Sequence, residues 1–488
     1  MDASYAICGK SILLFQTVTK QMKKRELWTI VYIFLGIFIA MSGFFVYSVQ
    51  LGARSVVNDS HNTRKKDLAK QVIRGTIYAA DGTVLAEEAL NSDGKEIRNY
   101  PYKELFAHVV GYSQMGTSGV ENAADIDLLT SNAPVSERLK KEMAGVRNTG
   151  DRIYTSLRPD LQMAAYRALG SYRGAIIVME AKTGRILAMV SKPDFDPNTV
   201  SENWAAISSD EEESPLVNRA TQGLYPPGSI FKIVTLYEYM RENPDTYESY
   251  SYDCTGKITV DDAKVECYHG SVHGHEDLLR SFADSCNTSF TNIGLSLDIP
   301  DLTDTTDRFL FGRVLPTDLS YNRSRFSLNS ASDTNEIMQT SIGQGSTLVT
   351  PLHVALITQA IANDGMMMRA QEIVKKTNYQ GTLIKEYEPE EYKRIMTAGE
   401  AASMKQYMRE VCITGTGKKF KGSSYAVAGK TGSAEFGNIK GMSHSWFTGF
   451  SDPDDPDIVV TVIMENGGSG SESAVPAAQY IFDSYYGI

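Results

Sequence analysis

The chain has 488 residues, of which 42% are hydrophobic and 22% are charged, as is ordinary for a globular protein. This length exceeds what one hydrophobic core usually holds, so two or three folding units are expected. The formal net charge of −11 argues against binding nucleic acid through a general basic surface. Five cysteines in a chain of this length do not make a disulfide framework.

An uncharged segment of 23 residues, Leu27–Val49, is long enough to cross a membrane as one helix. The basic cluster at residues 20–25 favours a cytoplasmic tail (1–26), an anchor (27–49) and an extracytoplasmic body, although basic residues also follow the span. The run is longer than a signal-peptide core and no small-x-small cleavage site follows, so an anchor is favoured over a cleavable signal. Met22 is an alternative start to Met1.

Residues 50–150 are predicted to form a small membrane-proximal domain, and residues 151–488 a second domain. In the first, the segment "RGTIYAADGTVLA" (74–86) has two strand-like pieces around Asp81-Gly82, which predicts a hairpin turn. The second begins with a predicted helix, in which Leu161, Ala165 and Leu169 repeat at helical spacing.

Predicted strands lie at both ends of the second domain. "GAIIVME" and "RILAMVS" are joined by "AKTG", which is typical of a hairpin with Gly184 at positive φ. Three more strands are predicted over 424–436, 444–451 and 457–466, followed by a helix over 475–486. The stretch 226–409 between these groups has a mostly helical pattern. Together they predict an α+β fold, with one antiparallel sheet assembled from both ends and covered by helices.

The segment "YPPGSIFKIVTLYEYM" places Ser229 and Lys232 on one face at the start of an apolar helix. A serine nucleophile needs a base, and a neutral lysine one turn away can serve if burial lowers its pKa. The helix N-terminus offers N–H groups to developing negative charge. An N-cap serine beside a solvated lysine is the alternative for an isolated S-x-x-K. In this sequence S-x-x-K also occurs at Ser92–Lys95, but a proline-glycine entry precedes only Ser229.

Ser285 and Asn287 in "ADSCNTSFTNIG" are candidates for proton relay and for holding a substrate carbonyl. S-x-N occurs five times, but only this copy follows Ser229 and precedes an apolar helical segment. Cys286 between them is expected to be packed rather than reactive, since nothing nearby stabilises a thiolate.

The tripeptide Lys-Thr-Gly occurs twice. On a predicted strand, Lys430 is suited to binding a substrate carboxylate and Thr431 to adding a hydrogen bond. Gly432 keeps the strand slim where substrate lies, and the N–H of Ser433 would complete an oxyanion hole with that of Ser229. The earlier copy, Lys182-Thr183-Gly184, is interpreted as a solvent-facing hairpin tip.

These three elements resemble the motif set of penicillin-binding proteins and serine β-lactamases. The wider chain resembles class B penicillin-binding proteins, the membrane-anchored D,D-transpeptidases that cross-link peptidoglycan. The matching segments in chain order are "RGTIYAADGTVLA", "GAIIVMEAKTGRILAMVSKPDFDPN", "NRATQGLYPPGSIFK", "SIGQGSTLVTPLHVALITQAIANDG" and "AGKTGSAEF". Ala79-Ala80 replaces the usual Asp-Arg pair, and Ser433 stands where threonine is commoner. The membrane-proximal section is short, and no C-terminal extension is expected.

The resemblance implies a penicillin-binding transpeptidase fold and an acyl-enzyme on Ser229, with Lys232 as base. It also implies that Ser285 relays protons, Asn287 orients the acyl chain, and Lys430 with Thr431 binds the carboxylate. The implied substrates are peptidoglycan stem peptides, with β-lactams as mimics. The implied partner is a polytopic glycosyltransferase of the shape, elongation, division and sporulation group. No cofactor and no nucleic-acid partner are expected.

Cysteine and histidine residues after residue 250 leave two further questions. The spacing C-x-H-x3-H-x-H from Cys267 to His275 fits no familiar zinc pattern, and no H-E-x-x-H is present, so no metal is expected. Cys254 and Cys267 flank a predicted hairpin, and a disulfide and two unpaired thiols are equal alternatives.

Three other functions are alternatives to transpeptidation, and each fits the sequence less well. A membrane-tethered serine β-lactamase has no evident need of a membrane-proximal domain. A non-catalytic penicillin-sensing or scaffold protein would usually carry further membrane spans or a protease domain. A D,D-carboxypeptidase would typically have a C-terminal membrane helix, for which "FDSYYGI" is too short.

Overall fold

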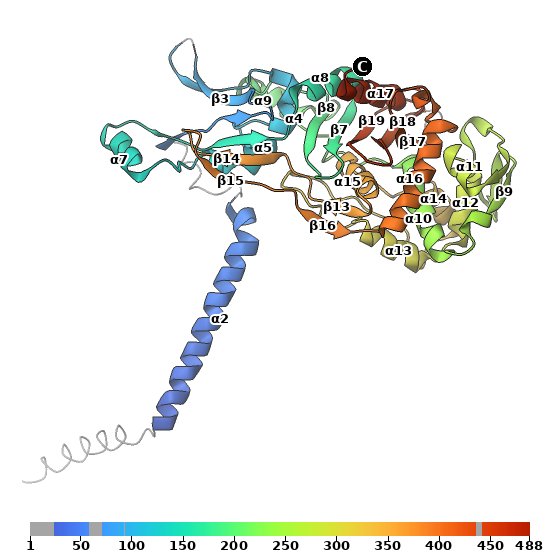
Figure 1. Ribbon diagram of the computed structural model, residues 1–488, viewed down its shortest axis with the longest axis horizontal. Helices are drawn as coiled ribbons and strands as arrows, with labels where there is room; N and C mark the ends of the chain where they lie inside the picture. The colour runs from blue at the N-terminus through green and yellow to red at the C-terminus, as the bar shows by residue number, and fades with distance from the viewer. Residues whose placement is uncertain (1–23, 58–70, 92, 436–441) are drawn as a thin grey trace, which may run out of the picture. The chain divides into compact units, whose positions relative to one another are not determined.

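The computed structural model describes residues 24–57, 71–91, 93–435 and 442–488 (Figure 1). The chain divides into two compact units, residues 1–64 and 65–488. In the first unit, helix α2 (Lys24–Val57) includes an apolar span, Trp28–Phe45, of which none is buried. Its exposed aromatic and aliphatic side chains, such as Phe34 and Phe38, favour hydrocarbon over water. The span therefore fits a membrane anchor in length and composition.

The membrane-proximal part of the second unit is built on a six-stranded sheet with the order β15-β14-β6-β2-β3-β4. Its strands are β2 (Ile77–Tyr78), β3 (Val84–Leu90), β4 (Glu96–Asn99), β6 (Arg152–Thr155), β14 (Ile373–Thr377) and β15 (Leu383–Glu386). The predicted turn at Asp81-Gly82 joins β2 and β3, with Gly82 at φ +87°. Strands β14 and β15 come from far along the chain, so the expectation of a mostly helical stretch over 226–409 was wrong there. The reason is long-range, since β14 forms by pairing with the open edge of β6.

A buried ion-pair network fixes the helices that pack on this sheet. Glu121 is fully buried and accepts from Arg74 at 2.6 Å and from Arg98 at 2.7 Å. Arg74 also contacts Asp125 at 2.6 Å. Burial opposes ionisation of Glu121, but the two guanidinium groups outweigh it and hold the pKa of this carboxyl below its usual value. Because each charge is paired, the network joins the start of the sheet to the segment 121–125.

The larger part of the second unit contains a five-stranded antiparallel sheet with the order β17-β18-β19-β7-β8. Its strands are β7 (Gly174–Glu180), β8 (Ile186–Lys192), β17 (Val427–Glu435), β18 (Ser443–Ser451) and β19 (Ile458–Met464). Strands from both ends of the domain thus meet in one sheet, as predicted. Gly184 lies in the β7–β8 turn with φ +73°, and a Cβ there would lie 2.6 Å from the carbonyl oxygen of Arg369.

Helices cover both faces of this sheet, which confirms the predicted α+β fold. Helices α8 (Pro159–Leu169) and α17 (Ala474–Tyr486) share one apolar core with the outward face (Figure 1). Leu161, Ala165 and Leu169 face that core, as their spacing predicted. The other face packs on α15 (Pro351–Ala362), α16 (Ala398–Ile413) and α10 (Lys232–Glu242).

A third group of elements lies beyond α10 and α16. It comprises α11 (Leu278–Ala283), α12 (Asn287–Ser296), β9 (Ser251–Cys254), β10 (Lys257–Val260), β11 (Ala263–Glu266) and β12 (Gly274–Asp277). Strands β10 and β11 form the hairpin expected between Cys254 and Cys267. Further helices are α4 (Ala107–Val110), α5 (Gly119–Ala123), α6 (Asp125–Leu128), α7 (Val135–Met143), α9 (Val200–Ser209), α13 (Ile299–Arg308) and α14 (Thr334–Ser341). Further strands are β1 (Val72–Ile73), β5 (Asn148–Thr149), β13 (Met366–Met368) and β16 (Glu391–Arg394).

Candidate active site

Ser229 lies in a short 3-10 turn, η2 (Gly228–Phe231), directly ahead of α10. Gly228 has φ +53°, and a Cβ there would lie 2.8 Å from the carbonyl oxygen of Ser433 on β17. Only glycine therefore lets the turn approach the strand this closely. The N–H of Gly228 also donates to the carbonyl of Gly343 at 2.9 Å, which ties the turn to a second glycine-containing loop.

The chain leading into Ser229 is fastened to the sheet by side-chain hydrogen bonds. Trp446 Nε1 on β18 donates to the carbonyl of Pro226 at 3.1 Å. Just beyond the end of β19, Glu465 accepts from the Tyr225 hydroxyl and from Arg219 Nε, both at 2.8 Å. These contacts hold the entry to η2 beside the start of β18 and the end of β19.

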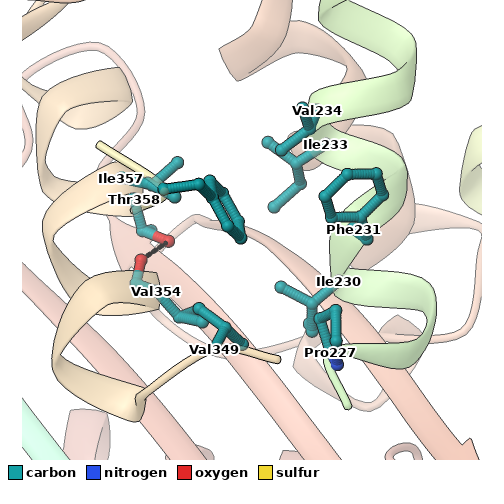
Figure 2. A pocket seen from close by; sticks show the side chains of 10 residues that line it. Pro227, Ile230, Phe231, Ile233, Val234, Val349, Val354, Ile357 and Thr358 are labelled. Carbon is teal, nitrogen blue, oxygen red and sulfur yellow. Dashed lines mark hydrogen bonds between the residues drawn. The ribbon is translucent and has the colours of Figure 1, made fainter. Parts of the chain in front are cut away.

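Behind the turn lies a dry apolar layer shared by η2, α10 and α15 (Figure 2). It encloses a cavity of about 20 Å³, lined by Pro227, Ile230, Phe231, Ile233, Val234, Phe311, Val349, Val354, Ile357 and Thr358. The Thr358 hydroxyl already donates to the carbonyl of Val354 at 2.9 Å. With so few free polar partners the cavity does not suit a water molecule, so on this side the turn is supported by apolar packing.

Lys232 is fully buried at the first turn of α10 and is held entirely by the S-x-N segment. Its Nζ donates to the Ser285 carbonyl at 2.6 Å, to Asn287 Oδ1 at 2.8 Å and to Ser285 Oγ at 3.3 Å. Burial lowers the pKa of this lysine to about 8, which leaves part of it neutral near physiological pH. Within the described part of the chain, no hydrogen bond joins Ser229 Oγ to Lys232; such catalytic contacts often tighten only when substrate binds.

Ser285 has the left-handed φ of +57°, in the tight connection between α11 and α12. This bend presents Ser285 and Asn287 to Lys232, while Cys286 is fully buried, as predicted. Asn287 Nδ2 also donates to the carbonyl of Glu266 at 3.0 Å, so its amide is oriented from both ends. The spacing of two residues in S-x-N is therefore what allows both side chains to reach the same lysine.

Lys430 lies in the middle of β17 and is fully buried. Its Nζ donates to Ser285 Oγ at 2.8 Å and to the Thr431 carbonyl at 3.0 Å. Burial, together with the charge of Lys232, lowers the pKa of Lys430 well below its usual value. The Ser285 hydroxyl thus links the two amines, and this chain of groups can pass a proton from one side of the site to the other.

Thr431, Gly432 and Ser433 continue along β17 at the edge of a pocket of about 270 Å³. The hydroxyls of Thr431 and Thr416 share a hydrogen bond of 2.5 Å. A Cβ on Gly432 would lie 3.0 Å from Ile230 Cγ1, so glycine lets η2 and β17 pack together. The predicted site residues all border this pocket except the two lysines, which lie buried behind Ser285.

Sequence reasoning missed Thr416 and Gly470, which also line the pocket. The N–H of Gly470 donates to Ser433 Oγ at 3.2 Å, and a Cβ there would lie 2.5 Å from the carbonyl oxygen of Gly432. The repeated glycines in "TGTG" (414–417) and "GGSGS" (467–471) are a weak signal of such close approaches.

The earlier tripeptide lies far from this chemistry. Lys182 is in the β7–β8 turn, its side chain is 60% exposed, and it pairs with the exposed Asp455. The prediction of a solvent-facing hairpin tip is confirmed.

A buried lysine beside a serine, with a serine-asparagine pair and a strand lysine around one pocket, is the arrangement of a serine acyl-transfer site. Comparison with known proteins agrees. The penicillin binding protein transpeptidase domain matches residues 174–483, and the penicillin binding protein A dimerisation domain matches residues 74–153. The chain belongs to the penicillin-binding protein transpeptidase family, and its resemblance to the class B group is confirmed.

One relative and two solved structures illustrate the match. The peptidoglycan D,D-transpeptidase PbpA of Mycolicibacterium smegmatis is 30% identical over 417 residues, which cover 81% of this chain and 84% of that protein. Penicillin-binding protein A of M. tuberculosis, solved as a penicillin G acyl-enzyme complex, is 27% identical with a TM-score of 0.76, covering 85% of this chain and 99% of that one. The D,D-transpeptidase domain of a peptidoglycan glycosyltransferase from Eggerthella lenta is 29% identical, also with a TM-score of 0.76, over 86% of this chain and 99% of that one.

Proposed function

We propose that the protein is a serine D,D-transpeptidase that cross-links peptidoglycan stem peptides and is acylated by β-lactams. The observation that carries this function is the buried chain Lys232–Ser285–Lys430 next to Ser229, at the floor of a polar pocket. The relatives named as peptidoglycan D,D-transpeptidases, and the penicillin acyl-enzyme of a structural neighbour, support it.

In the acylation step, neutral Lys232 takes the proton of Ser229 while Oγ attacks the carbonyl carbon of the penultimate D-Ala. The N–H groups of Ser229 and Ser433 stabilise the negative charge on the carbonyl oxygen. As the tetrahedral intermediate collapses, the peptide C–N bond breaks. The leaving nitrogen receives a proton through Ser285, and the terminal D-Ala departs with its carboxylate released from Lys430 and Thr431.

In the second step, an amine from a neighbouring stem peptide attacks the Ser229 ester. It loses one proton to the Ser285–Lys232 chain, a new amide bond forms as the bond between the acyl carbon and Ser229 Oγ breaks, and Oγ regains its proton from that chain. Asn287 orients the acyl chain between the two steps. A β-lactam enters the same path, but its leaving nitrogen stays attached through the opened ring, so the acyl-enzyme persists.

The test is intact-protein mass spectrometry of the full-length chain after fluorescent penicillin. We expect one adduct on wild type, none on Ser229→Ala, and an unchanged adduct on Ser209→Ala, an exposed serine of α9. The absence of an adduct on wild type, or an adduct that survives Ser229→Ala, would overturn the proposal. An adduct hydrolysed within seconds would identify a serine β-lactamase instead.

The finer assignments are also proposals. We infer a cytoplasmic N-terminus, an extracytoplasmic catalytic part, and domain boundaries at 50–150 and 151–488. The basic residues before the span support the orientation. A polytopic glycosyltransferase, contacted through the anchor and the membrane-proximal domain, is the proposed partner. Exchanging residues 28–45 for an unrelated span should abolish co-purification of that partner while leaving penicillin acylation intact; co-purification that persists argues against contact through the anchor.

A further inference from the structure

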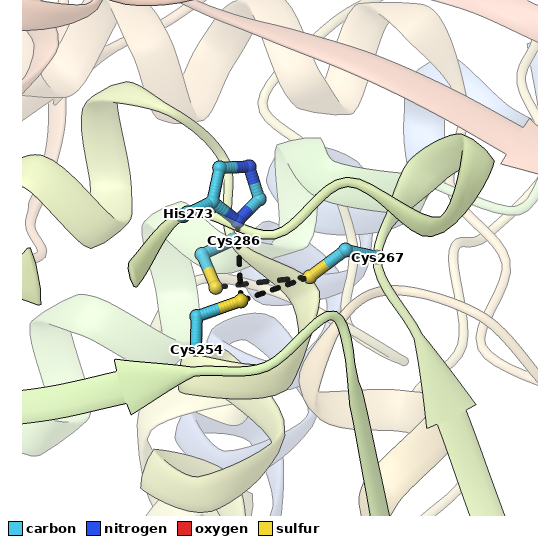
Figure 3. A group of neighbouring side chains, drawn as sticks. All are labelled: Cys254, Cys267, His273 and Cys286. Atoms are coloured by element: carbon cyan, nitrogen blue, oxygen red, sulfur yellow. Dashed lines mark hydrogen bonds between the residues drawn. The ribbon is translucent and has the colours of Figure 1, made fainter. Parts of the chain in front are cut away.

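Four potential metal ligands converge at the S-x-N segment (Figure 3). They are Cys254 at the end of β9, Cys267 just after β11, His273 just before β12, and Cys286 at the N-cap of α12. Their sulfur and nitrogen atoms all lie within 4.8 Å of one another. The three cysteines are at most 2% exposed.

The distances within this cluster are those of a tetrahedral metal site. Cys254 Sγ lies 3.7 Å from Cys267 Sγ, and Cys267 Sγ lies 3.8 Å from Cys286 Sγ. With zinc–sulfur bonds of about 2.3 Å, the edges of a tetrahedron are about 3.8 Å long. Cys254 Sγ lies 3.3 Å from His273 Nδ1, near the roughly 3.6 Å edge expected between a sulfur and a nitrogen ligand.

The same distances argue against a disulfide between Cys254 and Cys267, which would require a separation of about 2.0 Å. Of the two alternatives that the sequence left open, the structure has free thiols. Neither alternative, a disulfide or two unpaired thiols, took account of Cys286 and His273, which lie at similar distances. Thr288 Oγ1 lies 3.2 Å from Cys254 Sγ, and the N–H of Ser289 donates to Cys286 Sγ, so donors already face the sulfur atoms.

Of the small strands around the cluster, β10 and β11 share in the main hydrophobic core, since Val265 is buried in it and Ile258, Val260 and Ala263 pack against it, whereas little apolar packing surrounds the four ligands themselves. Strands β9, β10, β11 and β12 have four residues each and pair only as two isolated hairpin-like ladders. The apolar cluster there consists of Cys254, Cys267 and Cys286, with Tyr252 packed against it. Isolated two-stranded ladders are marginal in water, and small units of this kind usually need a metal or a disulfide. A bound metal would supply the missing cross-link.

We propose that Cys254, Cys267, His273 and Cys286 bind one Zn²⁺ in a closed, tetrahedral Cys3His site. The thiols lose their protons to solvent on binding, and four protein ligands leave no position for water or substrate, so the role is structural. The expectation of no metal rested on the spacing of three nearby histidines. The fold selects only one of them: His275 is exposed and pairs with Asp253, and His269 makes an edge-on contact with the Tyr268 ring.

The site has a direct consequence for catalysis because Cys286 lies between Ser285 and Asn287. A metal bond to Cys286 fixes the segment at the point where Ser285 adopts its left-handed φ. His273 also borders the active-site pocket. The four ligands are therefore positioning residues, and loss of the metal should slow acylation of Ser229 by up to about 100-fold through misplacement of Ser285 and Asn287.

The test uses the detergent-purified full-length protein, prepared without chelator, and elemental analysis. We expect about one zinc per chain in wild type. His273→Ala should lose the metal and acylate slowly with fluorescent penicillin, whereas the matched variant His275→Ala should keep both metal and rate. Replacement of zinc by cobalt(II) in wild type should give the visible bands of a tetrahedral site with thiolate-to-metal charge transfer, a readout that does not depend on any variant folding.

Three outcomes would overturn the proposal. The first is wild type without stoichiometric metal whose thiols all react with an alkylating agent in the native state. The second is a Cys254–Cys267 disulfide, seen as an intact mass that resists alkylation until reduction. The third is equal metal content in wild type and His273→Ala. None of these outcomes would remove the penicillin adduct on Ser229. The proposal of a metal site can therefore be refuted without refuting the proposed transpeptidase function.

Discussion

The two copies of Lys-Thr-Gly allow one chemical change to be made at a buried and at an exposed position. Lys430→Met and Lys182→Met each remove one ammonium group and keep most of the aliphatic stem. At Lys430 the lost group contacts Ser285 Oγ at 2.8 Å and is proposed to bind the substrate carboxylate. At Lys182 the lost group pairs with Asp455 in solvent.

The expected change in acylation rate follows from the contacts that each amine makes. A hydrogen bond to a charged group contributes about 1.5–3 kcal/mol, and 1.36 kcal/mol is tenfold in rate. Loss of the Lys430 contact to a β-lactam carboxylate should therefore lower the acylation rate constant by about 10- to 150-fold. Lys182→Met should leave that rate unchanged, because an exposed pair on the far turn touches neither substrate nor base.

The assay is the second-order rate of labelling by fluorescent penicillin, quenched at short times and resolved on a gel. Thermal melts of both variants control for folding. Removal of a buried amine should not destabilise the fold strongly, since its desolvation cost is removed with it. A rate for Lys430→Met within about threefold of wild type, or a slow Lys182→Met, would refute the assignment of the carboxylate-binding lysine.

Three further predictions concern the base, the membrane-proximal domain and the packing behind the nucleophile. Because neutral Lys232 is the proposed base and its pKa is about 8, acylation should rise about tenfold per pH unit below pH 8 and level off above it; a flat profile in stopped-flow measurements contradicts this base. Glu121→Gln removes the carboxylate that buried Arg74 and Arg98 share and leaves Arg98 only the Glu88 contact at 3.8 Å, so it should lower the free energy of unfolding by up to about 3–5 kcal/mol in urea titrations, while Glu88→Gln at the rim should cost far less. Val354→Ile adds one methylene beside the cavity of about 20 Å³ and should stabilise the protein by about 0.8 kcal/mol; a lower melting temperature would mean that the cavity cannot accept it.

The residues that the structure brings together around the pocket were predictable because their signals are local. Ser229 and Lys232 share one helical turn, Ser285 and Asn287 flank one residue, and Lys430 lies in an uninterrupted strand pattern. Each spacing fixes which side chains share a face before any long-range contact forms. The order of these three motifs along the chain then indicated that they contribute to a single pocket.

Other features depend on contacts that no local pattern encodes. Strand β14 becomes part of the membrane-proximal sheet only by pairing with β6, more than 200 residues earlier, and β15 is added by pairing with β14. The cysteine-histidine cluster comes from four separate segments, so its spacing resembles no short zinc motif. One of its members, Cys286, was already accounted for as the middle residue of S-x-N, and that local interpretation hid its second role.

The central position of Ser285 gives the site a way to couple substrate binding to activation of the base. Its hydroxyl lies between two buried amines, at 3.3 Å from Lys232 and 2.8 Å from Lys430. Two like charges this close, away from water, disfavour each other, so the pair holds two protonated amines only at a cost. A carboxylate arriving beside Lys430 stabilises the charged form of that lysine. The charge of Lys430 then favours the neutral form of Lys232, so the substrate group that is recognised on one side of Ser285 promotes the base needed on the other.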